Sequence, residues 1–281
     1  MTMTSTTENP EIGADVDAGG IRTNYHDAGE GFPVVLLHGS GPGVSAWANW
    51  RLNLPALSQR YRVIAPDIVG FGFTERPEGI SYDMETWKRH LVDFLDALGL
   101  EQVGLVGNSF GGALTLALAT SHPERIKRFV LMGSGGLSFP LTDGLDTIWG
   151  YEPSVESMGE LLTLMAYDRS LMSEDLAQLR FQASTRPGVQ EAYSAMFPAP
   201  RQEGIEAIAT PEDAIRQIAH EVLIVHGRED RLLPVDIGYR LLNLIDRAQL
   251  HVFGRCGHWT QIEHADRFNR LVSDFFAEEG V

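Results

Sequence analysis

A serine flanked by glycines lies at a predicted junction between a strand and a helix, and this feature constrains the rest of the chain. Residues 107–111 read GNSFG, a G-x-S-x-G motif. Residues 102–106 before it form an apolar run typical of a buried strand, and residues 112–119 after it are rich in helix formers. This setting predicts a nucleophile elbow, a sharp turn that exposes the hydroxyl of Ser109 at the N-terminus of a helix.

Apolar runs and helical patterns alternate along most of the chain. Short runs typical of buried strands occur at residues 34–37, 62–65, 128–132, 222–225 and 249–253. Apolar residues recur at helical spacing in residues 84–98, 235–245 and 265–276. Strands that alternate with helices indicate an α/β protein with a mostly parallel sheet and helices on both of its faces.

The pattern changes between residues 139 and 208. Prolines, methionines and aromatic residues are interspersed there, helical periodicity comes in short pieces, and no strand-like run occurs. We interpret residues 139–208 as a helical lid that is inserted into the core domain. Residues 1–138 and 209–281 then form the first and second parts of that domain.

Composition restricts the partners and the cellular compartment. The formal net charge of −16 argues against binding to nucleic acid or to an anionic membrane. Cys256 is the single cysteine, so an internal disulfide is excluded and a reducing compartment is expected. The polar first ten residues lack the apolar core of a signal peptide, and no apolar run is long enough to cross a bilayer. We expect a cytoplasmic protein.

Three residues with complementary chemistry follow the ends of predicted strands, where open parallel sheets bind their ligands. Ser109 follows residues 102–106, Asp230 follows 222–225, and His258 follows 249–253. The order Ser, Asp, His is that of the α/β-hydrolase fold. His258 is suited to take the serine proton, and Asp230 to orient the imidazole. Glu229 is the alternative acid, but the shorter Asp230 fits the acid turn of this fold better.

Two backbone N–H groups are candidates for an oxyanion hole. One belongs to Phe110, the residue after the nucleophile. The other belongs to Ser40, in a glycine-rich loop. The alternative interpretation of this loop is a plain turn without a functional role. No pair of histidines has the spacing of metal ligands and the cysteine stands alone, so we expect neither a metal nor another cofactor.

The residues around these positions resemble one branch of the superfamily, the meta-cleavage product hydrolases, which break carbon–carbon bonds in the degradation of aromatic rings. The similarity extends from about residue 21 to residue 276 and is closest to the 2-hydroxymuconate semialdehyde hydrolases and their alkyl-ketone relatives. The motifs that carry it are HGSGPG at 38–43, GNSFGG at 107–112, HGRED at 226–230, GHW at 257–259, WGYEP at 149–153, Arg180 and FPAPRQ at 197–202.

The resemblance implies hydrolysis of a 2-hydroxy-6-oxohexa-2,4-dienoate at its C5–C6 bond, to 2-hydroxypenta-2,4-dienoate and a small carboxylic acid. It also implies that Arg180, Asn108 and Trp259 hold the carboxylate and 2-oxo end, with Asn49 close by. A guanidinium suits a carboxylate, and an acidic protein needs such a local cation. On pattern alone, Arg180 would be a solvated charge on a lid helix.

A pocket for the C6 substituent is expected between the strand ends and the lid. Its candidate residues, which ordinary core packing would also explain, are Gly135, Trp149, Ile205 and Leu233. Their sizes favour hydrogen or a short alkyl group at C6. The expected partner is a small-molecule dienoate, and the protein is expected to be a homo-oligomer. The alternative functions are a carboxylesterase or lactonase of the same fold, and a ligand receptor on a hydrolase scaffold.

Overall fold

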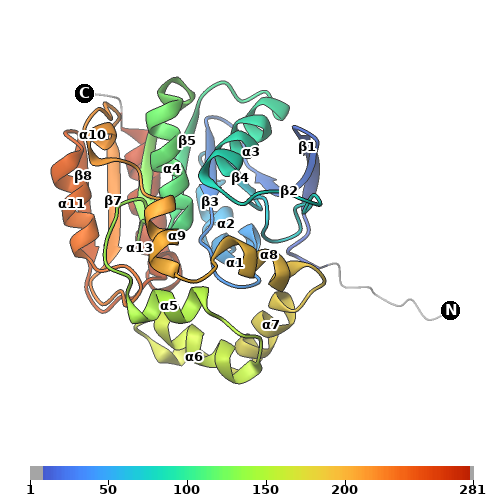
Figure 1. Cartoon of the computed structure of the whole chain (residues 1–281). Helices are drawn as coiled ribbons and strands as arrows, with labels where there is room; N and C mark the ends of the chain where they lie inside the picture. The colour runs from blue at the N-terminus through green and yellow to red at the C-terminus, as the bar shows by residue number, and fades with distance from the viewer. Residues whose placement is uncertain (1–8, 279–281) are drawn as a thin grey trace.

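A central sheet organises the molecule (Figure 1). The computed structural model describes residues 9–278, and within them eight strands form one sheet in the order β1-β2-β4-β3-β5-β6-β7-β8. Their bounds are β1 Ala14–Ala18, β2 Ile21–Ala28, β3 Pro33–Leu37, β4 Arg62–Pro66, β5 Val103–Asn108, β6 Ile126–Met132, β7 Val222–Gly227 and β8 Ala248–Phe253.

Most neighbouring strands are parallel. Strands β4, β3, β5, β6, β7 and β8 pair in parallel, whereas β1 with β2 and β2 with β4 pair antiparallel at one edge. The predicted mostly parallel sheet is therefore confirmed. Because the strands from β4 to β8 run in one direction, their carboxyl ends meet at one edge, and residues that follow them are brought together there.

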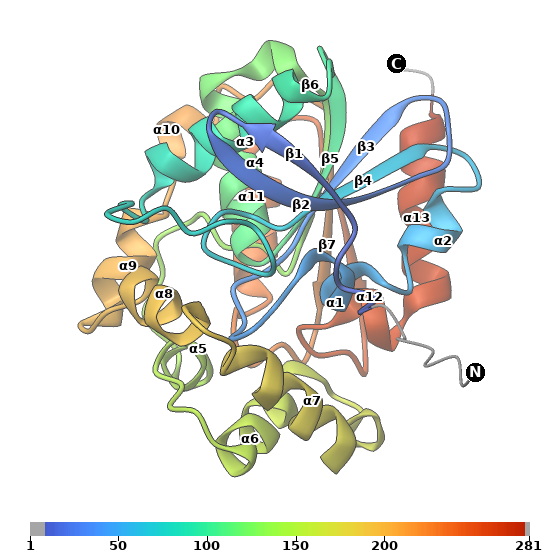
Figure 2. The same cartoon turned by 90° about the vertical axis from the view of Figure 1, so that its right-hand side faces the viewer.

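Helices cover both faces of the sheet (Figure 2). The helices α3, α4 and α11 lie on one face, and α1, α2, α12 and α13 lie on the other. Their bounds are α1 Ala46–Trp50, α2 Leu54–Leu57, α3 Met84–Ala97, α4 Phe110–Ser121, α11 Asp236–Leu244, α12 Thr260–Glu263 and α13 Ala265–Ala277. A 3₁₀ turn at Pro123–Arg125 precedes β6.

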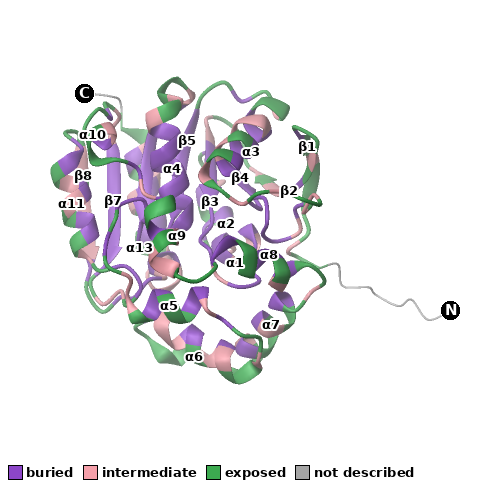
Figure 3. Cartoon of the chain, in the orientation of Figure 1, coloured by how far each residue is buried: buried purple, intermediate pink, exposed green. Residues whose placement is uncertain are grey.

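Alternation along each central strand explains why two layers of helices are needed. In β3, Val35 and Leu37 join the apolar core beneath α3 and α4, while Val34 and Leu36 join the core beneath α1 and α13. All four are fully buried. Continuous apolar runs are typical of strands covered on both faces, and the burial map shows the sheet buried between exposed helix surfaces (Figure 3).

Between β6 and β7 the chain forms a group of helices beside the carboxyl edge of the sheet (Figure 1). We call α5 to α9 the cap helices. Their bounds are α5 Asp143–Trp149, α6 Val155–Met165, α7 Glu174–Ser184, α8 Val189–Met196 and α9 Arg201–Ala207, with a 3₁₀ turn at Arg169–Leu171 and α10 (Glu212–Ile215) after them. Side chains of Thr142, Ser154 and Ser173 cap α5, α6 and α7 by accepting backbone hydrogen bonds.

Candidate active site

Ser109 occupies a strained turn between β5 and α4. Its φ of 54° and ψ of −113° lie outside the ordinary regions for a residue with a side chain, a conformation that costs about 1–3 kcal/mol. A Cβ atom on Gly107 would lie 2.5 Å from the carbonyl oxygen of Gly111, and one on Gly111 would lie 2.3 Å from that of Leu37. The motif therefore needs glycine at both positions so that the turn can close.

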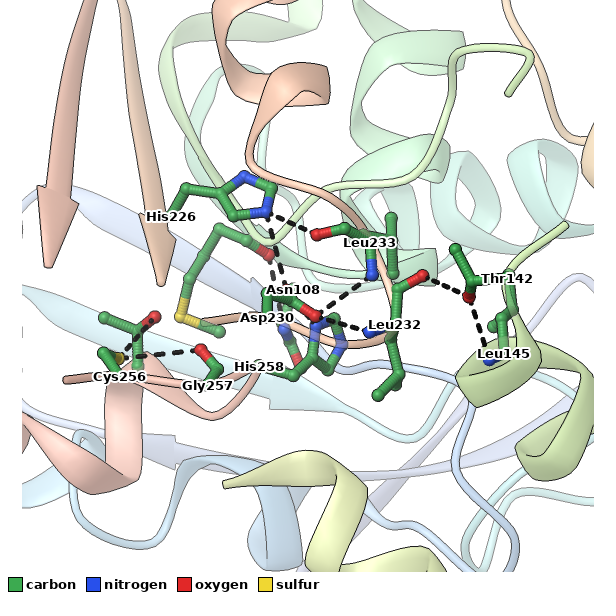
Figure 4. A network of polar contacts seen from close by, with 12 residues as sticks. Asn108, Thr142, Leu145, His226, Asp230, Leu232, Leu233, Cys256, Gly257 and His258 are labelled. Carbon is green, nitrogen blue, oxygen red and sulfur yellow. Dashed lines mark hydrogen bonds and ion pairs between the residues drawn. The ribbon is translucent and has the colours of Figure 1, made fainter. Parts of the chain in front are cut away.

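The imidazole of His258 is held by a buried carboxylate (Figure 4). Oδ2 of Asp230 lies 2.7 Å from Nδ1 of His258, and the two side chains are 0% and 4% exposed. His258 and Ser109 line the same cavity. With Nδ1 bonded to the carboxylate, Nε2 is the ring nitrogen left to exchange a proton with the serine or the ligand.

Asp230 is surrounded by hydrogen-bond donors. The N–H groups of Leu232 and Leu233 donate to its Oδ1, at 2.8 and 3.0 Å. Nε2 of His226 lies 3.5 Å from Oδ2 while it donates to the carbonyl of Leu233. Burial by itself would raise the pKa of Asp230, but the charge of His258 and the hydrogen bonds from His226 and His258 outweigh it and hold that pKa well below its usual range.

The neighbouring acidic and thiol groups face elsewhere. Glu229 accepts a hydrogen bond from the N–H of Cys256 through Oε2 and pairs with Arg228 through Oε1. The structure therefore brings Asp230, and not Glu229, to His258. Burial raises the pKa of the Cys256 thiol to about 12, which leaves it protonated and unreactive near neutral pH.

Two backbone N–H groups are free beside the serine. Within residues 9–278, neither Ser40 nor Phe110 donates its N–H to any protein acceptor, and both residues line a small cavity with Ser109. His38 fixes the loop of Ser40, because its Nε2 accepts from the N–H of Ile68 and its Nδ1 donates to the carbonyl of Gly39. Burial lowers the pKa of His38, so the ring stays neutral and keeps this arrangement.

The serine and histidine open into a cavity of about 350 Å³. Apolar side chains of α5, α6 and α7 form part of its walls, and loops and α1 of the core domain form the rest. The four residues predicted to bind the carboxylate end all line it, namely Asn49, Asn108, Arg180 and Trp259. A largely apolar cavity with a few convergent polar groups is the usual form of a small-molecule site.

A second cavity, also lined by Ser109, is much smaller. The four residues predicted for the C6 substituent line it together, namely Gly135, Trp149, Ile205 and Leu233. Its volume is about 10 Å³, which is room for about one water-sized group. The indole N–H of Trp149 also donates to Oγ of Ser40 at 3.1 Å, so this wall is tied to the loop of Ser40.

The cap helices are hydrogen-bonded to the loops that carry Asp230 and His258. Oγ1 of Thr142, at the start of α5, donates to the carbonyl of Leu232 (Figure 4). The N–H of Trp259 donates to the carbonyl of Met165, at the end of α6. A Cβ atom on Gly257 would lie 2.8 Å from the backbone nitrogen of Tyr167, so glycine there allows the close approach of the two segments.

Two charged residues of the cavity were not anticipated from the sequence. Glu11 forms an ion pair with Arg180, and Arg51 lines the same cavity. Glu11 stands in a polar start without any periodic pattern, and Arg51 follows a helix of only five residues. Neither residue has a local sequence signal, because its place in the cavity depends on contacts between segments that are far apart in the chain.

Comparisons with known proteins agree with this geometry. Residues 33–265 match the family described as the alpha/beta hydrolase fold. The structure is similar to that of CumD, a meta-cleavage product hydrolase from Pseudomonas fluorescens IP01 studied as a serine-to-alanine mutant complexed with acetates. The TM-score is 0.95 and the identity is 58%, over 96% of this chain and 99% of that one. The chain belongs to the meta-cleavage product hydrolases.

Curated relatives of this meta-cleavage product hydrolase extend over nearly the whole chain. The 2-hydroxy-6-oxo-2,4-heptadienoate hydrolase of Pseudomonas putida F1 is 61% identical over 98% of this chain and 99% of its own length. The 2-hydroxymuconate semialdehyde hydrolase of Pseudomonas sp. CF600 is 57% identical over 98% of both chains. The predicted fold and the resemblance to this family of serine-dependent hydrolases are confirmed.

Proposed function

We propose that the protein hydrolyses the C5–C6 bond of 2-hydroxy-6-oxohexa-2,4-dienoates with hydrogen or methyl at C6. The products are 2-hydroxypenta-2,4-dienoate and formic or acetic acid. One observation carries this proposal. Ser109 and His258, which is paired with Asp230, share a cavity with buried Arg180, and the chain's relatives are named for such substrates. A simple esterase needs the first feature but has no use for a buried cation.

The dienoate carboxylate would bind at Arg180 and Asn49. Nη1 of Arg180 and Nδ2 of Asn49 are buried, and neither has a hydrogen-bond partner within residues 9–278. Buried donors without partners are costly, and a carboxylate would satisfy both. Asn108 and Trp259 line the adjacent wall and would contact the 2-oxo end.

The chemistry follows from the poor leaving ability of a carbanion. The dienol first becomes a ketone by taking a proton at C5, and His258 is the proposed proton carrier. Ser109 and His258 then deliver an oxygen nucleophile to the C6 carbonyl, and the N–H groups of Ser40 and Phe110 bind the developing oxyanion. When the C5–C6 bond breaks, its electron pair enters the conjugated dienolate, and C6 leaves as a carboxylic acid whose hydroxyl group comes from water.

The volume of the small cavity restricts the substituent that the substrate can carry at C6. Its volume of about 10 Å³ accepts hydrogen or a methyl group but not a phenyl ring. This assignment of Gly135, Trp149, Ile205 and Leu233 to specificity follows the sequence prediction. The cap helices would act as the predicted lid of residues 139–208, because their apolar side chains close the larger cavity over the serine.

The substrate is proposed to be a free small molecule of the cytoplasm. No helix within residues 9–278 is long and apolar enough to cross a membrane, and the net charge of −16 disfavours anionic surfaces. The homo-oligomer stays a prediction, which light scattering after size-exclusion chromatography will measure.

The test is the loss of dienoate absorbance with substrates that carry hydrogen, methyl, isopropyl or phenyl at C6. We expect the first two to be turned over well and phenyl poorly. Ser109→Ala should slow turnover by roughly three or more orders of magnitude while the fold stays intact. If the wild type hydrolyses a broad set of esters but no dienoate, the carboxylesterase alternative replaces this proposal. Ligand binding without any turnover would favour a receptor.

A further inference from the structure

Glu11 joins two segments that carry predicted substrate-binding residues. Its Oε1 accepts a hydrogen bond from Nη2 of Arg180 at 2.5 Å, and its Oε2 accepts one from Oγ of Ser45 at 2.7 Å. Arg180 belongs to α7 of the cap, and Ser45 caps α1, the helix of Asn49. One carboxylate therefore connects the cap to the opposite wall of the cavity.

The backbone around Glu11 is fixed as well. Nδ2 of Asn24 donates to the carbonyl of Glu11 and to Oδ2 of Asp67, and Oδ1 of Asn24 accepts from the N–H of Gly13. Oδ1 of Asp67 in turn accepts from the N–H of Ala46, the first residue of α1. Glu11 is thus built into the same buried network that positions α1.

The charges of the arginines and the glutamate that line this part of the cavity sum to one positive unit. Arg51 and Arg180 are cations, and Glu11, which is paired with Arg180, is the anion. Burial lowers the pKa of Arg51, repulsion by Arg180 lowers it further, and attraction to Glu11 opposes both effects. A net charge of one matches a substrate with a single carboxylate.

The pair with Glu11 uses only one side of the guanidinium. Nη2 of Arg180 is bonded to Glu11, whereas Nη1 has no partner within residues 9–278 although it is buried. The residue as a whole is 9% exposed. A guanidinium is planar and rigid, so fixing one nitrogen also fixes the direction in which the other donates.

We propose that Glu11 is a positioning residue for substrate binding, which holds Arg180 so that Nη1 meets the substrate carboxylate. This rests on the proposed function, because it takes the dienoate carboxylate as the ligand of Arg180. Glu11 itself makes no contact with the reacting atoms. Its contribution passes through Arg180 and is therefore expected in the KM for dienoates.

The test compares Glu11→Ala and Glu11→Gln in steady-state kinetics with the C6-methyl dienoate. We expect Glu11→Ala to raise KM about tenfold or more, the scale of one misplaced charge-assisted hydrogen bond, with kcat changed less. Glu11→Gln should return KM to within about threefold of the wild type, because the amide oxygen still accepts from Arg180. Hydrolysis of p-nitrophenyl acetate should change little in both variants.

A double-mutant cycle with Arg180→Lys separates positioning from direct binding. If Glu11 acts through Arg180, Glu11→Ala should add little to the KM of Arg180→Lys, and fully additive effects would contradict the proposal. Glu221→Ala is the matched control, since it removes the partner of buried Arg128 outside the cavity. It should lower the melting temperature without changing the dienoate KM.

Three results would overturn the role of Glu11 while leaving the proposed function intact. These are an unchanged KM in Glu11→Ala, a lower KM, and an equal loss on the dienoate and the neutral ester. Should Glu11→Ala fail to fold, Glu11→Asp takes its place. Its shorter side chain cannot reach both Arg180 and Ser45, so a KM equal to that of Glu11→Gln would also contradict the proposal. Absence of dienoate turnover by the wild type would instead refute the proposed function.

Discussion

Oδ2 of Asp230 lies 2.7 Å from Nδ1 of His258, and Oδ1 of the same carboxylate accepts the N–H groups of Leu232 and Leu233. The two oxygens therefore have separate tasks. One fixes the carboxyl group to its own turn, and the other fixes the imidazole. Glu229, the adjacent acid, is fully occupied by Cys256 and Arg228.

Asp230→Asn should lower kcat by roughly three to four orders of magnitude, because an amide stabilises neither the required tautomer nor the imidazolium. Glu229→Gln is the matched control, since it neutralises the neighbouring residue and leaves the Asp230–His258 contact in place. We expect its kcat to stay within about threefold of the wild type, because it does not touch the reacting groups. Comparable losses in the two variants would contradict Asp230 as the orienting acid.

Arg180→Lys tests the carboxylate site. Lysine keeps the charge but not the planar fork, so its single nitrogen cannot donate to Glu11 and to the substrate along the two fixed directions of the guanidinium. We expect a loss of about 2–3 kcal/mol in transition-state binding of dienoates, measured from kcat/KM. Hydrolysis of p-nitrophenyl acetate should barely change. If both substrates suffer equally, Arg180 is structural and the carboxylate binds elsewhere.

The fold was largely predictable because its central strands and main helices carry strong local patterns. The buried run at 222–225 corresponds to β7 (Val222–Gly227), and the periodic segment at 84–98 corresponds to α3 (Met84–Ala97). The first strand, β1 (Ala14–Ala18), was not anticipated, because its sequence ADVDA is short and, although it alternates, consists mostly of alanine and aspartate, which have low β propensity. It forms by pairing with β2 at the edge of the sheet, which is a tertiary contact.

Part of the candidate site was likewise predictable from local patterns, and part of it was not. Ser109, Asp230 and His258 follow strand ends, so the strand pattern alone indicates that they meet. The partnership of Arg180 with Glu11 joins residues 169 positions apart and has no periodic signal. The size of the acyl cavity depends on side chains from the strand ends, the cap helices and the Asp230 turn, so only the packed structure provides it.

His90 makes the stability of the fold dependent on pH. Burial lowers its pKa to about 4, and its Nε2 lies 2.8 Å from Oγ1 of Thr23. As the pH falls from about 6.5 to 4, the unfolded chain takes up this proton and the folded chain does not. The free energy of unfolding therefore falls by about 3 kcal/mol at most over that range, and the contribution is constant above it.

His90→Gln should remove this part of the pH dependence, because an amide can donate to Thr23 but does not titrate. Urea unfolding measures the free energy of unfolding of both proteins at pH 7.5 and at pH 4.5. The difference between the two pH values should be smaller in the variant. Some dependence will remain, because burial also lowers the pKa of His38. An identical decrease in the two proteins would show that His90 is charged in the folded state.

Gly135→Val tests the acyl cavity, the small cavity that we propose for the C6 substituent. A Cβ atom at Gly135 would lie 3.5 Å from the carbonyl oxygen of Ser109 and 3.9 Å from Cδ1 of Ile208, which is ordinary contact. The added methyl groups would narrow a cavity of about 10 Å³. Overpacking typically costs about 1–3 kcal/mol, so kcat/KM for the C6-methyl substrate should fall about tenfold or more relative to the C6-hydrogen substrate.

Backbone strain is the rival explanation, and the adjacent glycine provides the control for it. Gly136 has a φ of 102°, whereas Gly135 is not among the described glycines with positive φ. Gly136→Ala should therefore lower the melting temperature and reduce activity on both substrates alike. Gly135→Val should instead keep a melting temperature near that of the wild type and change the preference between substrates. An unchanged preference in Gly135→Val would remove this residue from the specificity site, because narrowing of the acyl cavity must discriminate by size.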